Sequence, residues 1–176
     1  DRMSEAIENT LNNYIIKLEE NGFVMQTNKS GCKVVGNFLL TIMLHNIYGS
    51  IRVESFIDRR GISISLVWNK YYYGDFMDCS QIDGAIKEIA QVVGLIQRIE
   101  KLTGLVSDIY LQSEKGIANV SVFRCVKCGE EFAYIAPAHP SIKIGGINYS
   151  FDELETMDNE KLSSLINTKH NCIKDE

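Results

Sequence analysis

The sequence predicts an α+β fold in which an antiparallel β-sheet meander is covered by helices and followed by a C-terminal hairpin–helix module. Two amphipathic helical stretches, 4–21 and 79–104, enclose a series of short apolar segments. Turn-forming residues separate these segments, which is typical of antiparallel strands. The 176 residues, 45% of them hydrophobic, suffice for one ordinary core, or for one core with a small appended module.

The first predicted helix begins near Ser4 and ends near Asn21 and Gly22, which form a common helix C-terminal signal. Apolar residues recur along it at steps of three and four, the period of an α-helix. These residues are Ile7, Leu11, Tyr14, Ile15 and Leu18.

Four strands are predicted to follow, at 23–27, 32–45, 51–57 and 62–68. The second segment is long, and Gly36 marks a bulge or a break within it. In the last segment apolar residues alternate with smaller or polar ones, as they do in a half-buried strand. Tight turns and this period of two indicate a meander with one face available to a helix.

The second predicted helix, 79–104, has Ser80 as its expected N-cap and Gly104 as the residue just past its end. Its apolar stripe is predicted to cover the sheet, and a coiled-coil seam is the alternative. The stripe consists of Ile82, Ile86, Ile89, Val93, Ile96 and Ile99. Two further strands, 105–112 and 117–124, complete the order α-β-β-β-β-α-β-β.

Five cysteines carry most of the chemical information in the chain. Cys32 and Cys79 stand alone in mixed apolar stretches and are expected to be small buried hydrophobes. Cys125 and Cys128 form a C-x-x-C-G motif, which a disulfide framework, a redox pair or a metal site could use. A disulfide framework is not expected inside a cell, and a redox pair needs a helix where 131–136 predicts a strand.

A metal site needs two more ligands, and His170 and Cys172 supply them near the C-terminus. Zinc takes four thiolate and imidazole ligands tetrahedrally in closed structural sites. The C-x-x-C-G motif resembles the knuckles of zinc-ribbon and related zinc-finger modules, whose glycine eases the backbone turn. We therefore expect one structural zinc per chain, bound by Cys125, Cys128, His170 and Cys172, with His139 as an alternative fourth ligand.

The second ligand pair departs from the zinc-finger pattern, because it is H-x-C and follows Cys128 only after a long interval. One intervening residue is not a helical step, so the pair is expected just past a helix end. The interval contains a Gly-Gly hairpin signal within 142–149 and a capping box at 150–153 that opens a helix ending near Thr168. Knuckle, hairpin, helix and ligand pair together predict a zinc-stapled module.

The chain is therefore expected to have two domains, an α+β domain at 1–124 and a zinc-binding module at 125–176. The second carries 5 basic and 9 acidic residues, so it holds most of the net charge of −5. Binding Zn²⁺ through three thiolates would add about one further negative charge. Such an acidic module is a poor phosphate binder, which argues against nucleic acid as its partner.

The expected function is that of a non-enzymatic interaction or regulatory protein, with a protein partner or self-association through an edge strand or the aromatic segment 68–76. One alternative is nucleic-acid binding through the basic and aromatic surface of 59–73. That surface would use Arg59, Arg60, Trp68, Lys70 and the tyrosines Tyr71, Tyr72 and Tyr73.

A metal-dependent enzyme with an unrecognised site is the second alternative. Four protein ligands leave zinc no open position for water, and the chain lacks the zincin, P-loop and nucleophile-elbow motifs. At the N-terminus no basic segment precedes an apolar one, and the longest apolar run, 38–44, is much shorter than the roughly 20 residues that span a bilayer. An intracellular, cytoplasmic protein that does not bind membranes is expected.

Overall fold

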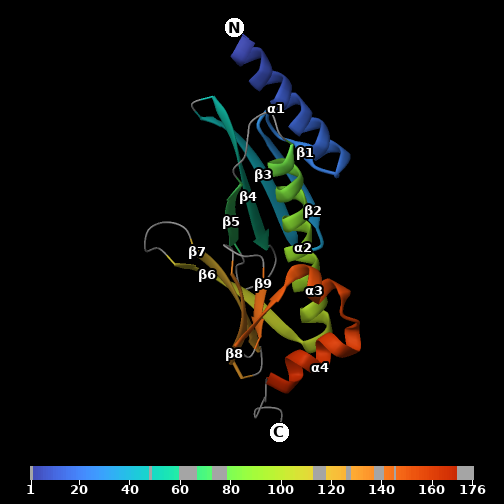
Figure 1. The fold of residues 1–176 in the computed structure, drawn as a ribbon. Coiled ribbons are helices and arrows are strands. Elements are labelled where there is room, and N and C mark those ends of the chain that lie inside the picture. The colour runs from blue at the N-terminus through green and yellow to red at the C-terminus, as the bar shows by residue number, and fades with distance from the viewer. Residues whose placement is uncertain are drawn as a thin grey trace. The chain divides into compact units, whose positions relative to one another are not determined.

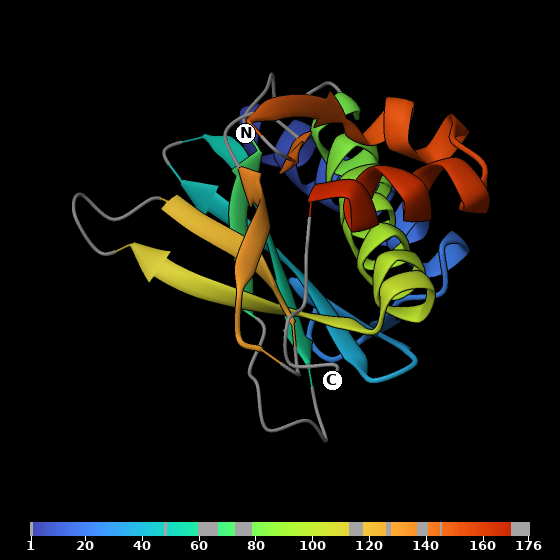
Figure 2. The ribbon, with the colours of Figure 1, turned by 90° about the horizontal axis from the view of Figure 1, so that it is seen from below.

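The computed structural model confirms the α+β class (Figures 1 and 2). It describes residues 2–47, 49–59, 67–72, 79–112, 118–125, 128–136, 141–144 and 146–169. The chain divides into two compact units, the first formed by Asp1–Ile62 with Val67–Ala90 and the second by Ser63–Leu66 with Gln91–Glu176. The long helix α2 (Ser80–Thr103) contributes its first half to one unit and its second half to the other.

The first unit contains helix α1 (Arg2–Glu20) and a five-stranded antiparallel meander. Its strands, each paired with its sequence neighbour, are β1 (Val24–Met25), β2 (Ser30–Val35), β3 (Phe38–Ile47), β4 (Ser50–Arg59) and β5 (Val67–Tyr72). The predicted segment 32–45 is broken at Gly36, one of the two outcomes expected there, and its two parts are β2 and β3, which form a hairpin. Gly36 has φ +57°, which lets a two-residue turn join Val35 to its partner Phe38.

One face of this sheet forms the core of the first unit. Alternate residues of β3 are buried, and so are their cross-strand partners on β4. The buried apolar residues of the two strands are Phe38, Leu40, Ile42, Leu44, Ile51, Val53 and Ile57. Helix α1 adds Ile7, Tyr14 and Leu18 to the buried set, as its predicted stripe requires.

The C-terminus of α1 confirms the predicted stop signal at Asn21 and Gly22. Gly22 has φ +88°, and its N–H donates to the carbonyl of Glu19 at 3.1 Å. The N–H of Phe23 donates to the carbonyl of Leu18 at 3.0 Å, which completes a Schellman motif. Phe23 is buried, so the turn directs the chain back toward the core as it enters the sheet.

Helix α2 confirms the second predicted helix, and Gly104, with φ +72°, follows its end as expected. The helix begins at Ser80, and Cys79 occupies the cap position because its carbonyl accepts from the N–H of Asp83 at 3.0 Å. Ser80 is thus the first helical residue rather than the N-cap. The buried apolar residues of α2 form one stripe, and of the predicted members only Ile86 is half-buried. The buried members are Ile82, Ala85, Ile89, Val92, Val93, Leu95, Ile96 and Ile99.

The second unit is built on another five-stranded antiparallel meander. Its strands are β6 (Leu105–Gln112), β7 (Ala118–Cys125), β8 (Glu131–Ala136), β9 (Ser141–Ile144) and β10 (Ile147–Ser150). The hairpin predicted from the Gly-Gly signal is confirmed as β9 and β10, with Ile147 paired to Ile144. The domain boundary expected after residue 124 falls at the end of β7, and independent folding of 125–176 stays a prediction.

Two helices, rather than the one predicted, follow β10. The Ser150 half of the expected capping box is confirmed, because the N–H of Glu153 donates to Ser150 Oγ at 3.0 Å at the start of α3 (Phe151–Thr156). Met157 is extended and ends α3. A second cap then opens α4 (Asn159–Lys169), in which Asp158 Oδ1 accepts from the N–H of Lys161 at 2.7 Å.

The buried contact between Tyr14 and Gln81 links α1 to the start of α2, with Gln81 Nε2 donating to the Tyr14 hydroxyl at 2.7 Å. The variant Tyr14→Phe would leave this buried amide without its acceptor, which costs about 1–3 kcal/mol. We expect urea unfolding to show that loss. The double variant Tyr14→Phe/Gln81→Leu should recover part of it, while the exposed control Asn12→Ala should change the free energy of unfolding little. An unaltered Tyr14→Phe midpoint would contradict this.

Candidate metal centre

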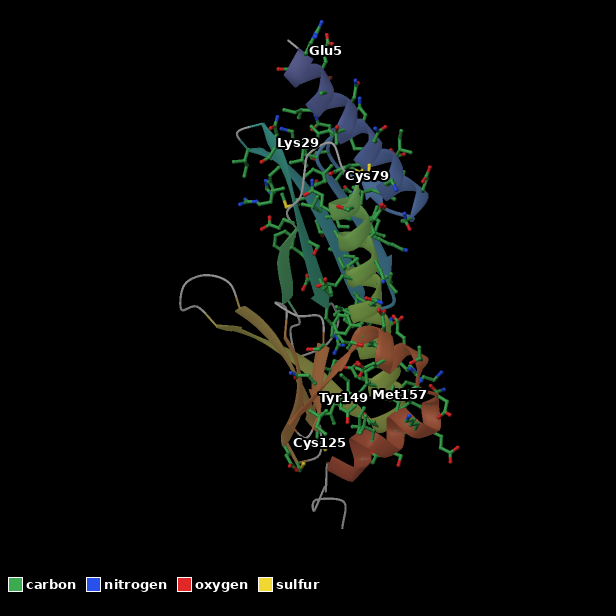
Figure 3. All side chains as sticks on the ribbon, viewed as in Figure 1. Glu5, Lys29, Cys79, Cys125, Tyr149 and Met157 are labelled. Carbon is green, nitrogen blue, oxygen red and sulfur yellow. The ribbon has the colours of Figure 1, made fainter. Side chains whose placement is uncertain are left out.

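The two cysteines of the C-x-x-C-G motif lie in the turn between β7 and β8. Cys125 is the last residue of β7 and is 5% exposed, whereas Cys128 is half-buried within the turn. Figure 3 labels Cys125 at this end of the strand. Both side chains carry thiols that are not joined in a disulfide. The strand β8 that follows confirms the prediction for 131–136 and offers no helix N-terminus to a redox pair.

The backbone of this turn is closed by two hydrogen bonds. The N–H of Cys125 donates to the carbonyl of Glu130 at 3.0 Å, and the N–H of Gly129 donates to the carbonyl of Cys125 at 2.8 Å. Gly129 has φ +74°, a conformation that L side chains rarely adopt. The motif therefore forms a tight turn. The position directly after the second cysteine favours glycine, because the backbone there has a positive φ.

The sheet next to the turn is irregular. Phe123 pairs with Ala133, but Arg124 pairs with Glu131, so β8 carries one extra residue between these pairs. Bulges of this kind bend a strand and change the direction of the side chains beside them, and they are frequent next to functional sites. Here the bulge lies directly before Cys125, where the strand ends and the turn begins.

The second predicted ligand pair, His170 and Cys172, lies outside the described residues, as does His139. Helix α4 ends at Lys169, which confirms that a helix precedes this pair. Within the second unit, the end of α4 and the β7–β8 turn lie at the same end (Figure 1). Among the residues that the structure describes, no group of three or more His, Cys, Asp or Glu side chains is arranged to hold a metal ion.

The other cysteines are partly exposed rather than buried as expected. Cys32 is half-buried because it lies on the face of the first sheet opposite the helices, where its Sγ is 3.6 Å from Thr41 Oγ1. Cys79 is half-buried at the start of α2. Neither cysteine lies near a described set of metal ligands.

The basic and aromatic surface expected over 59–73 is only partly described, and one of its members is not on the surface. Arg59 is 4% exposed, and its guanidinium Cζ lies 4.6 Å from the centre of the Phe38 ring. Trp68, Lys70, Tyr71 and Tyr72 belong to β5, whereas Arg60 and Tyr73 lie outside the described residues. A buried Arg59 cannot offer its charge to a phosphate.

Sequence reasoning missed a pair of polar side chains on β3 and β4. His45 Nε2 lies 3.1 Å from Glu54 Oε1, and the two side chains are 29% and 10% exposed. The β3–β4 register, which pairs His45 with Arg52 and Met43 with Glu54, puts the histidine and the carboxylate diagonally adjacent on one face.

Comparisons with protein-family models, with curated proteins and with solved structures find no match to this chain. In the part of the chain that the structure describes, no helix has the length and apolar character needed to cross a bilayer.

The knuckle turn can be tested through its glycine. The variant Gly129→Ala places a Cβ where no heavy atom beyond the two neighbouring residues lies within 4 Å, so its cost is backbone strain of about 1–2 kcal/mol at positive φ. Gly146→Ala is the matched control, because Gly146 has φ +87° and equally open surroundings in the β9–β10 hairpin. We expect similar losses of stability in urea unfolding, but weaker zinc binding for Gly129→Ala alone. Equal zinc affinity in both variants would contradict a role for the turn in metal binding.

Proposed function

We propose that this chain is a non-enzymatic interaction or regulatory protein whose second unit is held by one structural zinc ion. The ligands would be Cys125 and Cys128 from the β7–β8 turn and His170 and Cys172 from the residues after α4. The observation that carries this proposal is the closed turn between β7 and β8, in which Cys125 and Gly129 are joined by a backbone hydrogen bond. Two cysteines, Cys125 and Cys128, lie within four residues of each other in this turn, directly beside the sheet.

The donor set favours zinc over other divalent ions. Thiolates select zinc over magnesium or calcium, and a mixed thiolate and imidazole set suits a tetrahedral ion. With four protein ligands the ion would have no position for water or substrate, so its role would be to stabilise the fold. The loss of protons from the ligand thiols would make binding weaker as pH falls.

Exposed apolar residues on the first sheet support a protein partner. Val24 and Val34 are 65% and 73% exposed, and both lie on the sheet face opposite the buried one. Leu39 and Phe56 lie half-buried on the same face. Neighbouring apolar side chains on one face favour contact with protein more than with a phosphate backbone.

The burial of Arg59 and the negative net charge of residues 125–176 weigh against the nucleic-acid alternative. We expect no gel shift of single-stranded or double-stranded DNA or RNA oligonucleotides, even at low ionic strength where phosphate contacts are strongest. A shift that weakens steeply with added salt would instead support nucleic-acid binding.

The metal itself is tested by mass. Native mass spectrometry of the full chain should find one zinc per chain, lost on chelation or in the variants Cys128→Ser and Cys172→Ser. Cys79→Ser, which changes a half-buried cysteine in the first unit, is the matched control and should keep its zinc.

Loss of zinc should also loosen the second unit selectively. We expect faster hydrogen exchange in β7, β8 and α4 after chelation, with little change in β3 and β4, because the ion would tie together segments of the second unit. A folded chain that contains no zinc, or one whose exchange is unaffected by chelation, would contradict the proposal.

A further inference from the structure

Arg98, on the second half of α2, makes three hydrogen bonds to the junction between α3 and α4. Its Nε donates to Asn159 Oδ1 at 2.8 Å, and its Nη1 donates to the carbonyl of Leu154 at 3.0 Å. Its Nη2 donates to the carbonyl of Met157. Figure 3 labels Met157 at this junction. One side chain therefore holds the end of one helix and the first residue of the next.

The acceptors explain why an arginine occupies this position. The last carbonyls of a helix have no partner within the helix and must bind another donor. The carbonyl of Leu154 lies in the last turn of α3, and that of Met157 lies in the interruption before α4. A guanidinium offers several donors in a rigid plane, so it can satisfy both carbonyls and Asn159 at once, whereas a lysine ammonium cannot match that geometry.

A second contact holds α3 without involving this junction. Gln91 lies seven residues before Arg98 and therefore on the same side of α2. Its Nε2 donates to Asp152 Oδ1 at 2.9 Å and approaches Glu155 Oε2 at 3.5 Å. Loss of Arg98 should thus leave α3 attached to α2 while the direction of α4 becomes less fixed.

The direction of α4 sets the position of its last residue, Lys169. The helix has 11 residues, roughly 16 Å at 1.5 Å per residue, and it buries Leu162 and Ile166 along one face. Its last residue, Lys169, directly precedes His170. A small change of angle at the start of such a helix becomes a displacement of several ångströms at its end, which exceeds the tolerance of a metal–ligand bond.

We propose that Arg98 is a positioning residue for the metal centre: it fixes the α3–α4 junction and so sets the position of the end of α4, which directly precedes the proposed ligand pair. This inference rests on the proposed zinc site. It adds that the affinity of the site depends on a residue that is not a ligand and that belongs to the long helix α2. Partners that hold metal ligands in place typically change metal affinity by about 10–100-fold when they are removed.

The experiment compares Zn²⁺ affinity by chelator competition, and Co²⁺ absorption spectra, for the full-length wild type and three variants. Arg98→Met removes all three donors. Arg98→Lys keeps the positive charge but lacks the planar guanidinium. Tyr14→Phe is the control, because it is expected to lower stability through a contact that lies within the first unit. Thiolate-to-Co²⁺ charge-transfer bands report how many thiolates bind, which a general loss of stability does not alter in folded protein.

We expect Arg98→Met to weaken zinc binding at least tenfold and to shift the Co²⁺ spectrum from three thiolates toward two, because the knuckle pair remains. The zinc affinity of Arg98→Lys should lie between those of Arg98→Met and the wild type. Arg98→Lys serves as the test variant if Arg98→Met does not fold. Tyr14→Phe should match the wild type.

Wild-type spectra and affinities within about twofold for both Arg98 variants would overturn the positioning role while leaving the zinc site intact. An equal loss in Tyr14→Phe would also overturn it, because the effect would then reflect stability alone. A wild type that binds neither ion would overturn the zinc site itself, and the inference with it.

Discussion

The burial of one apolar stripe along α2 is the constraint on which both units depend. An antiparallel sheet with one apolar face must have that face covered, and a helix with a continuous stripe can supply the cover. Within this 24-residue helix the stripe stays in phase from Ile82 to Ile99, and its members are buried apart from Ile86, which is half-buried. A polar substitution within the stripe would therefore remove cover from the unit to which that residue belongs.

The polar contacts of α2 follow the same division. Its first half contacts α1 through Gln81 and Tyr14, and through the exposed ion pair of Asp83 with Lys17 at 2.9 Å. The hydrogen bond that the Lys17 ammonium donates to the Asp83 carboxylate raises the pKa of Lys17. The second half contacts α3 and α4 through Gln91 and Arg98. Along one helix, each unit thus obtains both an apolar contact and a specific polar one.

Most of the elements could be predicted from the sequence because their signals are local. Helical periodicity placed α1 and α2, and Gly22, Gly104 and the Ser150 cap marked ends that the structure confirms. Local signals did not decide two places. Gly36 was compatible with both a bulge and a break. The single helix expected after the hairpin is wrong, because the apolar positions of α3 and α4 continue past Met157, where Asp158 starts a new helix. Tertiary contacts decide such cases, since Arg98 binds the carbonyls at that interruption.

The candidate site could be predicted only in part, for a related reason. The C-x-x-C-G motif is contiguous, so its turn is set by local backbone geometry, and Gly129 adopts the positive φ that the motif implies. The contact between His45 and Glu54, in contrast, depends on the register of two strands, which single residues do not reveal. The same holds for Arg59, whose burial against Phe38 follows from the cross-strand pairing of these two residues.

Both sheets are meanders in which every strand pairs with its neighbour in sequence, and this has a consequence for how the chain can fold. Short loops between paired strands mean that little chain entropy is lost in closing each hairpin, so the contact order of each sheet is low. The contacts of Gln91 and Arg98 with α3 and α4 join residues 56 to 64 positions apart. Native contacts are therefore formed between nearby residues in the sheets and between distant residues at the α3–α4 junction, where Arg98 makes three of them.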